Sequence, residues 1–113
     1  MMEDFAKISG DKNPLHISDK FAQEKGFPAR VVYGMLVSSL YSRLAGMYIP
    51  GKNCLLQTVK SYFLSPVFLG DVLNVEGKIT EKHDSIKQIV IKANVFNQQG
   101  KKVSRAVIEA GCI

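Results

Sequence analysis

The sequence predicts a single α+β domain in which one long helix is followed by a meander of antiparallel strands. Two observations lead to this prediction. Residues 31–49 are mostly apolar and repeat with a helical period, whereas residues 54–112 alternate with the period of strands. A chain of 113 residues has room for one hydrophobic core, so we treat 1–113 as one domain.

A short helix is expected over residues 2–9, because Phe5 and Ile8 lie three residues apart among good helix formers. Gly10 would end it, as glycine commonly does just past a helix. No strand pattern precedes this helix, so a truncated start of the domain is an open alternative.

Residues 10–17 are predicted to form a loop that carries the first candidate site. Pro14 fixes its own φ and favours an extended Asn13, so Asp11 and His16 can meet only if the chain folds back. A histidine held by a loop near a carboxylate is a common general acid/base arrangement. The alternative is that Asp11 caps a turn and His16 is a surface residue.

A second short helix is predicted from Asp19 to Lys25, with Ser18 as its N-cap. The long helix follows from Val31. Its leucines recur every four residues and its apolar stripe is so wide that we expect a helix buried on all sides. A buried core helix also explains this segment better than a membrane span, because Arg43 lies within it.

Gly34 is the second candidate, because it lies at the start of the long helix. A helix N-terminus offers unpaired N–H groups, which could polarise a carbonyl and stabilise an oxyanion. The alternative is that Gly34 only allows tight packing. Ser42 lies two turns further along, where a hydroxyl bonded to its own helix is the simpler expectation.

Four strands are predicted, and Asn97–Gly100 reads as a hairpin turn before the last of them. In the first strand, Leu56, Thr58 and Lys60 are expected to share one face. A four-stranded sheet has two unpaired edges, and pairing of sheets in a dimer would cover one. The predicted strands are Cys54–Phe63, Val72–Lys82, Ile86–Phe96 and Val103–Cys112.

The composition points away from several classes of function. The net charge of +5 is spread along the chain without a basic run, which argues against a nucleic-acid partner. Cys54 and Cys112 match no metal-ligand pattern, and a disulfide between them is neither required nor excluded. The acidic N-terminus lacks the basic region of a secretory signal, so we expect a cytoplasmic protein with no membrane partner.

Several motifs together resemble the MaoC-like dehydratase family, which includes the (R)-specific enoyl-CoA hydratases. The resemblance covers nearly the whole chain. It implies the hotdog fold, in which a strongly bent antiparallel sheet wraps a long central helix, and a homodimer or higher homo-oligomer. The motifs are Asp11-x-Asn13-Pro14-Leu15-His16, Tyr33-Gly34-Met35-Leu36, Ser42 and Pro66-Val67-Phe68-Leu69-Gly70-Asp71.

The resemblance implies hydration of a trans-2-enoyl thioester to the (R)-3-hydroxyacyl thioester, without a metal or redox cofactor. The carrier, CoA or acyl-carrier protein, is left open. By position, Asp11 and His16 would hold and activate water and handle the α-proton. The Gly34 amide would form the oxyanion hole, with Asn13, Ser42 and Tyr33 in support. The acyl chain would run into the core, and cofactor phosphates would lie on the basic surface.

Two departures from the family pattern are visible. The family usually has histidine where this chain has Tyr33, and it normally has an N-terminal strand, so we expect the sheet to be one strand short. Two alternative functions therefore stay open. One is an acyl-CoA thioesterase, because hotdog folds host both activities. The other is a non-catalytic protein that binds acyl thioesters.

Overall fold

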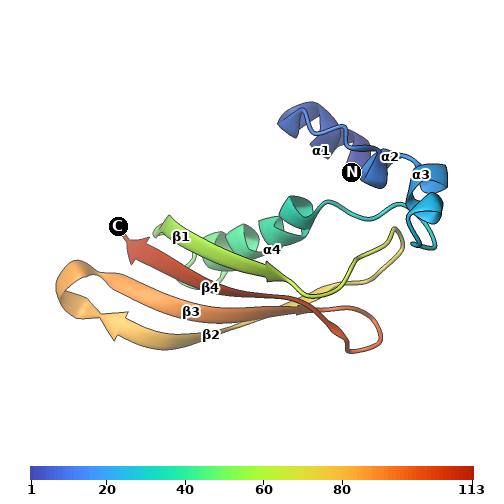
Figure 1. Ribbon diagram of the computed structural model, residues 1–113. Helices are drawn as coiled ribbons and strands as arrows, with labels where there is room; N and C mark the ends of the chain where they lie inside the picture. Colours follow the sequence, from blue (N-terminus) through green and yellow to red (C-terminus); the bar gives the residue numbers. More distant parts are fainter.

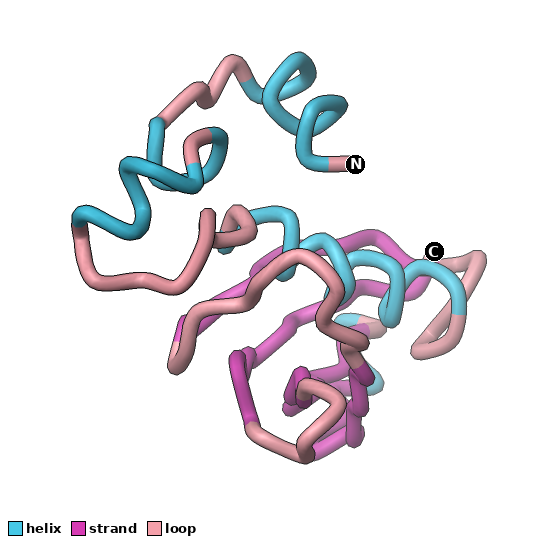
Figure 2. Tube along the Cα trace, turned by 90° about the vertical axis from the view of Figure 1, so that its right-hand side faces the viewer, coloured by secondary structure: helices cyan, strands magenta, loops and turns pink.

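The computed structural model describes residues 1–113 and shows a curved sheet with the longest helix on one face (Figures 1 and 2). Three short helices lie beyond the N-terminal end of that helix. The predicted order of short helices, one long helix and four strands is confirmed, with a third short helix, α2, that the sequence analysis did not predict. The elements are α1 (Met2–Ser9), α2 (Pro14–Ile17), α3 (Asp19–Glu24), α4 (Gly34–Met47), β1 (Cys54–Phe63), β2 (Asn74–His83), β3 (Gln88–Phe96) and β4 (Lys102–Cys112).

The sheet has four antiparallel strands in the order β1-β4-β3-β2. Both outer strands therefore have one unpaired edge. Strand β1 contains a bulge at Gln57, so that Leu56 lies opposite Ala110 and Thr58 lies opposite Glu109. Adjacent β4 residues point to opposite faces. The expectation that Leu56 and Thr58 share a face is therefore wrong, because the bulge inserts one unpaired residue between them.

The main core lies between α4 and the inner face of the sheet. Tyr41 contributes a fully buried ring from α4, and its hydroxyl donates a hydrogen bond of 2.8 Å to Ser104 on β4. Helix α4 packs on β1, β2 and β4. At Gly77 on β2 the helix comes so close that an added Cβ would lie 2.6 Å from the Leu44 side chain. The sheet therefore holds α4 through close, largely apolar contacts.

The sequence analysis expected helix α4 to be buried on all sides, but one of its faces is exposed. Val37, Tyr41 and Leu44 face the sheet, but Met35 and Met47 are 66% and 69% exposed in the single chain. The wide apolar stripe on this helix therefore includes a face that the chain itself does not cover. No helix in the structure is long and apolar enough to cross a membrane.

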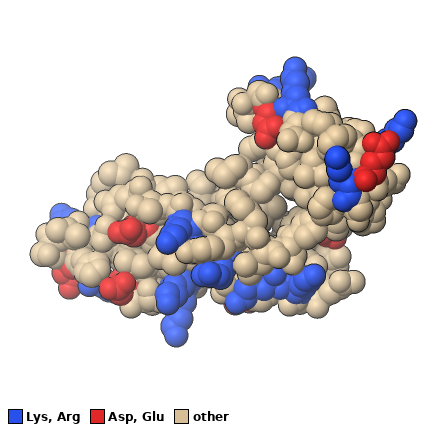
Figure 3. Space-filling model, in the orientation of Figure 1, with Lys and Arg blue, Asp and Glu red and all other residues tan.

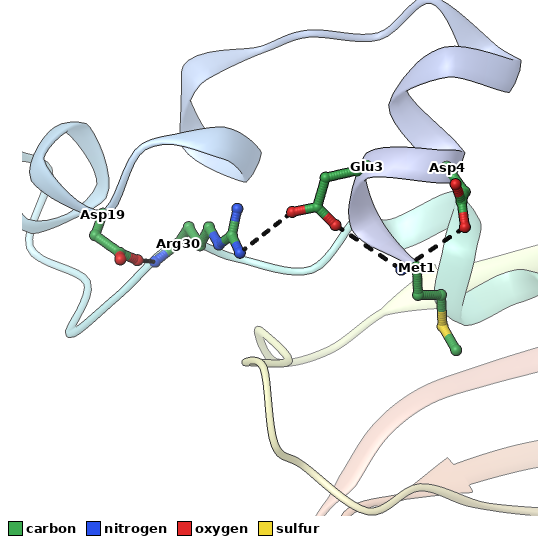
Figure 4. Close-up of polar contacts among 5 residues, drawn as sticks. All are labelled: Met1, Glu3, Asp4, Asp19 and Arg30. Atoms are coloured by element: carbon green, nitrogen blue, oxygen red, sulfur yellow. Dashed lines mark hydrogen bonds and ion pairs between the residues drawn. The ribbon is translucent and has the colours of Figure 1, made fainter.

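The N-terminal helices form a separate layer. Here the predicted loop is partly wrong, because residues 14–17 form one helical turn that begins at Pro14, where a missing N–H costs nothing. Arg30 links the layer together: its N–H donates to Asp19 at 2.9 Å, and its guanidinium lies 3.7 Å from Glu3 (Figure 4). Ser18 caps α3 as predicted, with its hydroxyl accepting from the Phe21 amide at 3.1 Å.

The outer face of the sheet carries a concentration of positive charge. Lys78 on β2 lies directly opposite Lys92 on β3. Both lysines, and Lys60 on β1, are exposed. None of them forms an ion pair. Figure 3 shows Lys and Arg side chains gathered over the strands on the face in view. Like charges directly opposite each other destabilise a sheet.

The two cysteines lie at one end of the sheet. Cys54 begins β1 and is directly opposite Cys112, which ends β4. Both thiols are free and partly buried. Burial, and then the neighbouring Cys112, raise the pKa of the Cys54 thiol. The two cysteines face each other because of the antiparallel register of β1 and β4, which the sequence alone did not establish.

Candidate functional site

The segment between α1 and α2 is ordered by side-chain caps. The Asp11 carboxylate accepts a hydrogen bond from the Asn13 amide at 3.0 Å through Oδ1, and Asn13 in turn caps α2 by accepting from the Leu15 amide at 2.9 Å. Short polar side chains favour such local turns. The second oxygen of Asp11 is left free and the residue is exposed. Asn13 therefore orders the loop through its own backbone amide and its capping side chain.

His16 is fixed by a residue that the sequence analysis did not single out. Its Nδ1 lies 2.7 Å from the Val31 carbonyl oxygen. A carbonyl can only accept, so Nδ1 carries the proton, and in the neutral imidazole Nε2 is then the proton acceptor. The structure shows no hydrogen bond between His16 and the Asp11 carboxylate, so these two residues share a loop without forming a direct pair.

Tyr33 connects the loop to the start of α4. Its ring stacks on His16 with 4.2 Å between ring centroids, and the Phe5 ring lies 4.8 Å away at a tilt of 46°. Its hydroxyl donates to the Asp11 backbone carbonyl at 2.5 Å. The side chain is only 2% exposed. The two sequence motifs that lie seventeen residues apart are thus in direct contact.

Gly34 is the first residue of α4, next to Tyr33. The amide groups of Gly34 and Met35 donate no hydrogen bond, as expected for the first turn of a helix. A Cβ at position 34 would lie 3.1 Å from the Phe63 ring of β1. A larger residue would require the Phe63 ring to shift, and the Gly34 N–H lies at the positive end of the α4 dipole.

Two apolar hollows lie along the first turns of α4. One, of about 260 Å³, is lined by Gly34, Phe63 and apolar side chains of α4 and the segment after β1. Another, of about 420 Å³, lies between α1, α4 and residues 67–73 and is almost entirely apolar. Both open to the surface, and the smaller one offers apolar space beside the candidate oxyanion donor.

Ser42 lies apart from the other candidates in the single chain. It is exposed and forms no hydrogen bond, so the expected bond to its own helix is absent. It lines a hollow of about 430 Å³ between α4 and β1, together with Ser38, Ser61 and Phe63. That hollow contains neither Asp11 nor His16. No group of three or more His, Cys, Asp or Glu side chains is placed to hold a metal ion.

A long helix held against a bent antiparallel sheet, with an acid and a histidine beside the helix N-terminus, defines a hotdog-fold protein with a candidate acid/base site. The chain belongs to the MaoC-like domain family, whose model matches residues 1–100. The resemblance drawn from the motifs is thereby confirmed.

The chain is similar to proteins named as hydratases and dehydratases. The (R)-specific enoyl-CoA hydratase of Aeromonas caviae is 35% identical over 85% of this chain and 72% of its own length. A mitochondrial 3-hydroxyacyl-[acyl-carrier-protein] dehydratase of Arabidopsis thaliana is 38% identical over 76% of this chain, but this covers only 51% of that protein. The solved structure of the A. caviae (R)-hydratase matches 99% of this chain and 85% of its own, with a TM-score of 0.93 and 30% identity.

Sequence reasoning missed two residues at the site. Val31 holds His16 through its backbone carbonyl, and a backbone contact leaves no mark on residue type. Phe63 covers Gly34 from β1, and the alternating pattern of that strand gave it no special position. The structure leaves the Gly34 amide unpaired and places Tyr33 beside the loop, while the roles that the motifs suggest for these residues stay predictions.

Proposed function

We propose that this chain is a hydratase/dehydratase that adds water to a trans-2-enoyl thioester to give the (R)-3-hydroxyacyl thioester. The observation that supports this best is the His16 tautomer. Nδ1 is committed to the Val31 carbonyl, so Nε2 is free to take a proton, and the adjacent Tyr33–Gly34 segment offers an unpaired N–H. A base and an oxyanion donor are the two groups that such a reaction needs.

In the proposed mechanism the thioester carbonyl accepts a hydrogen bond from the Gly34 amide, which draws electron density away from C3. Asp11 and His16 hold the water, and His16 Nε2 takes one of its protons as the water oxygen bonds to C3. The Gly34 N–H and the α4 dipole stabilise the resulting enolate oxygen. The protonated His16 then gives this proton to the α-carbon of the enolate, so that one water molecule is added overall.

The direct test follows the loss of enoyl absorbance with crotonyl-CoA and longer enoyl-CoA substrates. Asp11→Asn and His16→Ala are each expected to lower kcat/KM by about 10²- to 10⁴-fold. His83→Ala is the matched control, because His83 is an exposed histidine that lies on the far end of β2. An inactive parent protein, or variants that keep full activity, would rule out the proposed reaction.

The same samples separate the alternative activities. Release of free thiol, detected with a disulfide reagent, would identify an acyl-CoA thioesterase. Binding of acyl-CoA without turnover would identify a non-catalytic binding protein. We expect EDTA to leave the hydratase rate unchanged, because the proposed steps need neither a metal nor a redox cofactor. Comparing CoA and acyl-carrier-protein thioesters of one chain length would identify the preferred carrier.

We also propose that the protein works as a homodimer or higher homo-oligomer in the cytoplasm. Its radius of gyration is 15.7 Å, whereas a compact domain of this length would have about 13 Å. Edge strand β1 and the outer face of α4 both expose large apolar side chains, among them Leu55, Met35 and Met47. Pairing of the β1 edges would cover this surface. A monomeric mass in sedimentation equilibrium at micromolar concentration would contradict it.

A further inference from the structure

Three hydrogen bonds join residues 31–33 to the loop that carries the candidate acid and base. The Val31 amide donates to the Leu15 carbonyl at 3.0 Å, and the Val31 carbonyl accepts from His16 Nδ1 at 2.7 Å. The third bond runs from the Tyr33 hydroxyl to the Asp11 carbonyl at 2.5 Å. Only the third comes from a side chain that a substitution can shorten by one atom without disturbing the backbone.

The packing and the protonation of Tyr33 both favour a lasting hydrogen bond from its hydroxyl. It packs between His16 and Phe5 in a small apolar cluster with Met2 and Ala6, so its ring has little freedom to move. Burial raises the pKa of the Tyr33 phenol, and the negative charges of Asp11 and Glu3 raise it further. The hydroxyl therefore keeps its proton, and the hydrogen bond persists across the neutral pH range.

We propose that Tyr33 is a positioning residue that holds the Asp11–His16 loop against the N-terminus of α4. Its backbone continues directly into Gly34, the proposed oxyanion donor, while its side chain contacts both ends of the loop. One residue thus sets the spacing between the imidazole and the Gly34 amide. The tyrosine that departs from the usual family histidine is, in this view, a working part of the site.

The geometric demand of the reaction gives this contact its effect. Reacting groups must be held within a fraction of an ångström, and a displacement of about 1 Å can cost as much as 10²-fold in rate. Helix α2 is only one turn long and contributes no fully buried residue. Without the Tyr33 hydroxyl, the Asp11 end of the loop would lose its only hydrogen bond to the α4 side of the site.

The test compares Tyr33→Phe with Tyr41→Phe. Both substitutions remove one buried tyrosine hydroxyl and its hydrogen bond, but Tyr41 lies in the main core and contacts Ser104. For Tyr33→Phe we expect kcat to fall about tenfold with KM within about twofold of the parent. We also expect hydrogen exchange at the Val31 amide to rise about tenfold, because loosening of the loop exposes its bond to Leu15. Tyr41→Phe should lower the melting temperature and leave both quantities unchanged at 15 °C.

The inference rests on the proposed function, but the two can fail separately. Hydrogen exchange reports the loop whether or not the protein hydrates enoyl thioesters, so an inactive parent removes the function and leaves this readout intact. Equal exchange at Val31 in Tyr33→Phe and the parent would overturn the positioning role. Faster exchange with an unchanged kcat in an active enzyme would overturn it as well.

Discussion

Oxidation of the two thiols tests the strand register at the end of the sheet. Cys54 and Cys112 are direct antiparallel partners, and residues so placed have Cα atoms about 4.5–5.5 Å apart, which is within the range that a disulfide spans. The two cysteines do not hydrogen-bond each other through their backbones. The Cys54 amide donates to the Gly51 carbonyl, and the Cys112 amide donates to the Lys87 carbonyl. They therefore form a non-hydrogen-bonded pair, in which side chains approach most closely.

The expected gain follows from the length of chain between them. A cross-link from residue 54 to residue 112 closes a loop of about 58 residues, and the chain-entropy relation gives about 4 kcal/mol at 25 °C for a loop of this size. For a chain of this length that corresponds to a rise of up to about 15 °C in Tm. Native-state strain would reduce the gain, so the figure is an upper bound.

The assay treats the purified protein with diamide, confirms loss of two thiols per chain by mass spectrometry, and compares Tm before and after reduction. The reaction should be faster at alkaline pH, because the pKa of the Cys54 thiol is raised by burial and by Cys112. Cys54→Ser and Cys112→Ser, given the same oxidant, should show no increase in Tm. Failure of the parent to cross-link within one chain, or a lower Tm of the cross-linked form, would refute the inferred register.

Three further predictions concern stability. Burial raises the pKa of both Tyr33 and Tyr41 above that of a free phenol; the unfolded chain therefore ionises first, and stability present below pH 10 is lost as the pH rises through the folded-state values. Urea unfolding between pH 8 and 11 should show this loss, and Tyr41→Phe should reduce it. Lys78→Glu should raise the free energy of unfolding by about 0.5 kcal/mol at low salt, because it faces Lys92, and 1 M NaCl should remove the gain. Gly77→Ala should cost about 1–3 kcal/mol by overpacking against the α4 leucine, and a urea midpoint equal to the parent's would contradict the close contact.

The fold could be predicted from the sequence where periodicity is strong. The four strands were placed within two residues of their ends, because each presents a clear repeat of apolar residues, whereas the long helix begins at Gly34, three residues later than predicted. The bulge at Gln57 was not predictable, since one inserted residue leaves no local signature. The exposure of Met35 and Met47 was also missed, because an apolar face covered by the chain looks the same in sequence as one left open.

For the candidate site, the motifs indicated which residues to examine but not how they connect. A histidine near a carboxylate suggested an acid/base pair of Asp11 and His16, whereas in the structure each has a different partner. Tyr33 looked like a weakness of the site, because the family usually has histidine there. Its contact with the Asp11 carbonyl depends on tertiary packing between α1 and the start of α4, which no local pattern in the sequence describes.

The division of the core into two clusters has a consequence for how the protein would lose activity. His16 belongs to the N-terminal helical layer, which rests on the small cluster around Met2 and Tyr33, whereas α4 from Val37 onward is held by the large cluster under the sheet. Small clusters open at lower free energy than a main core. On heating, the N-terminal helical layer that carries Asp11 and His16 should therefore open while the sheet is still folded, and activity should be lost below the temperature at which the sheet unfolds.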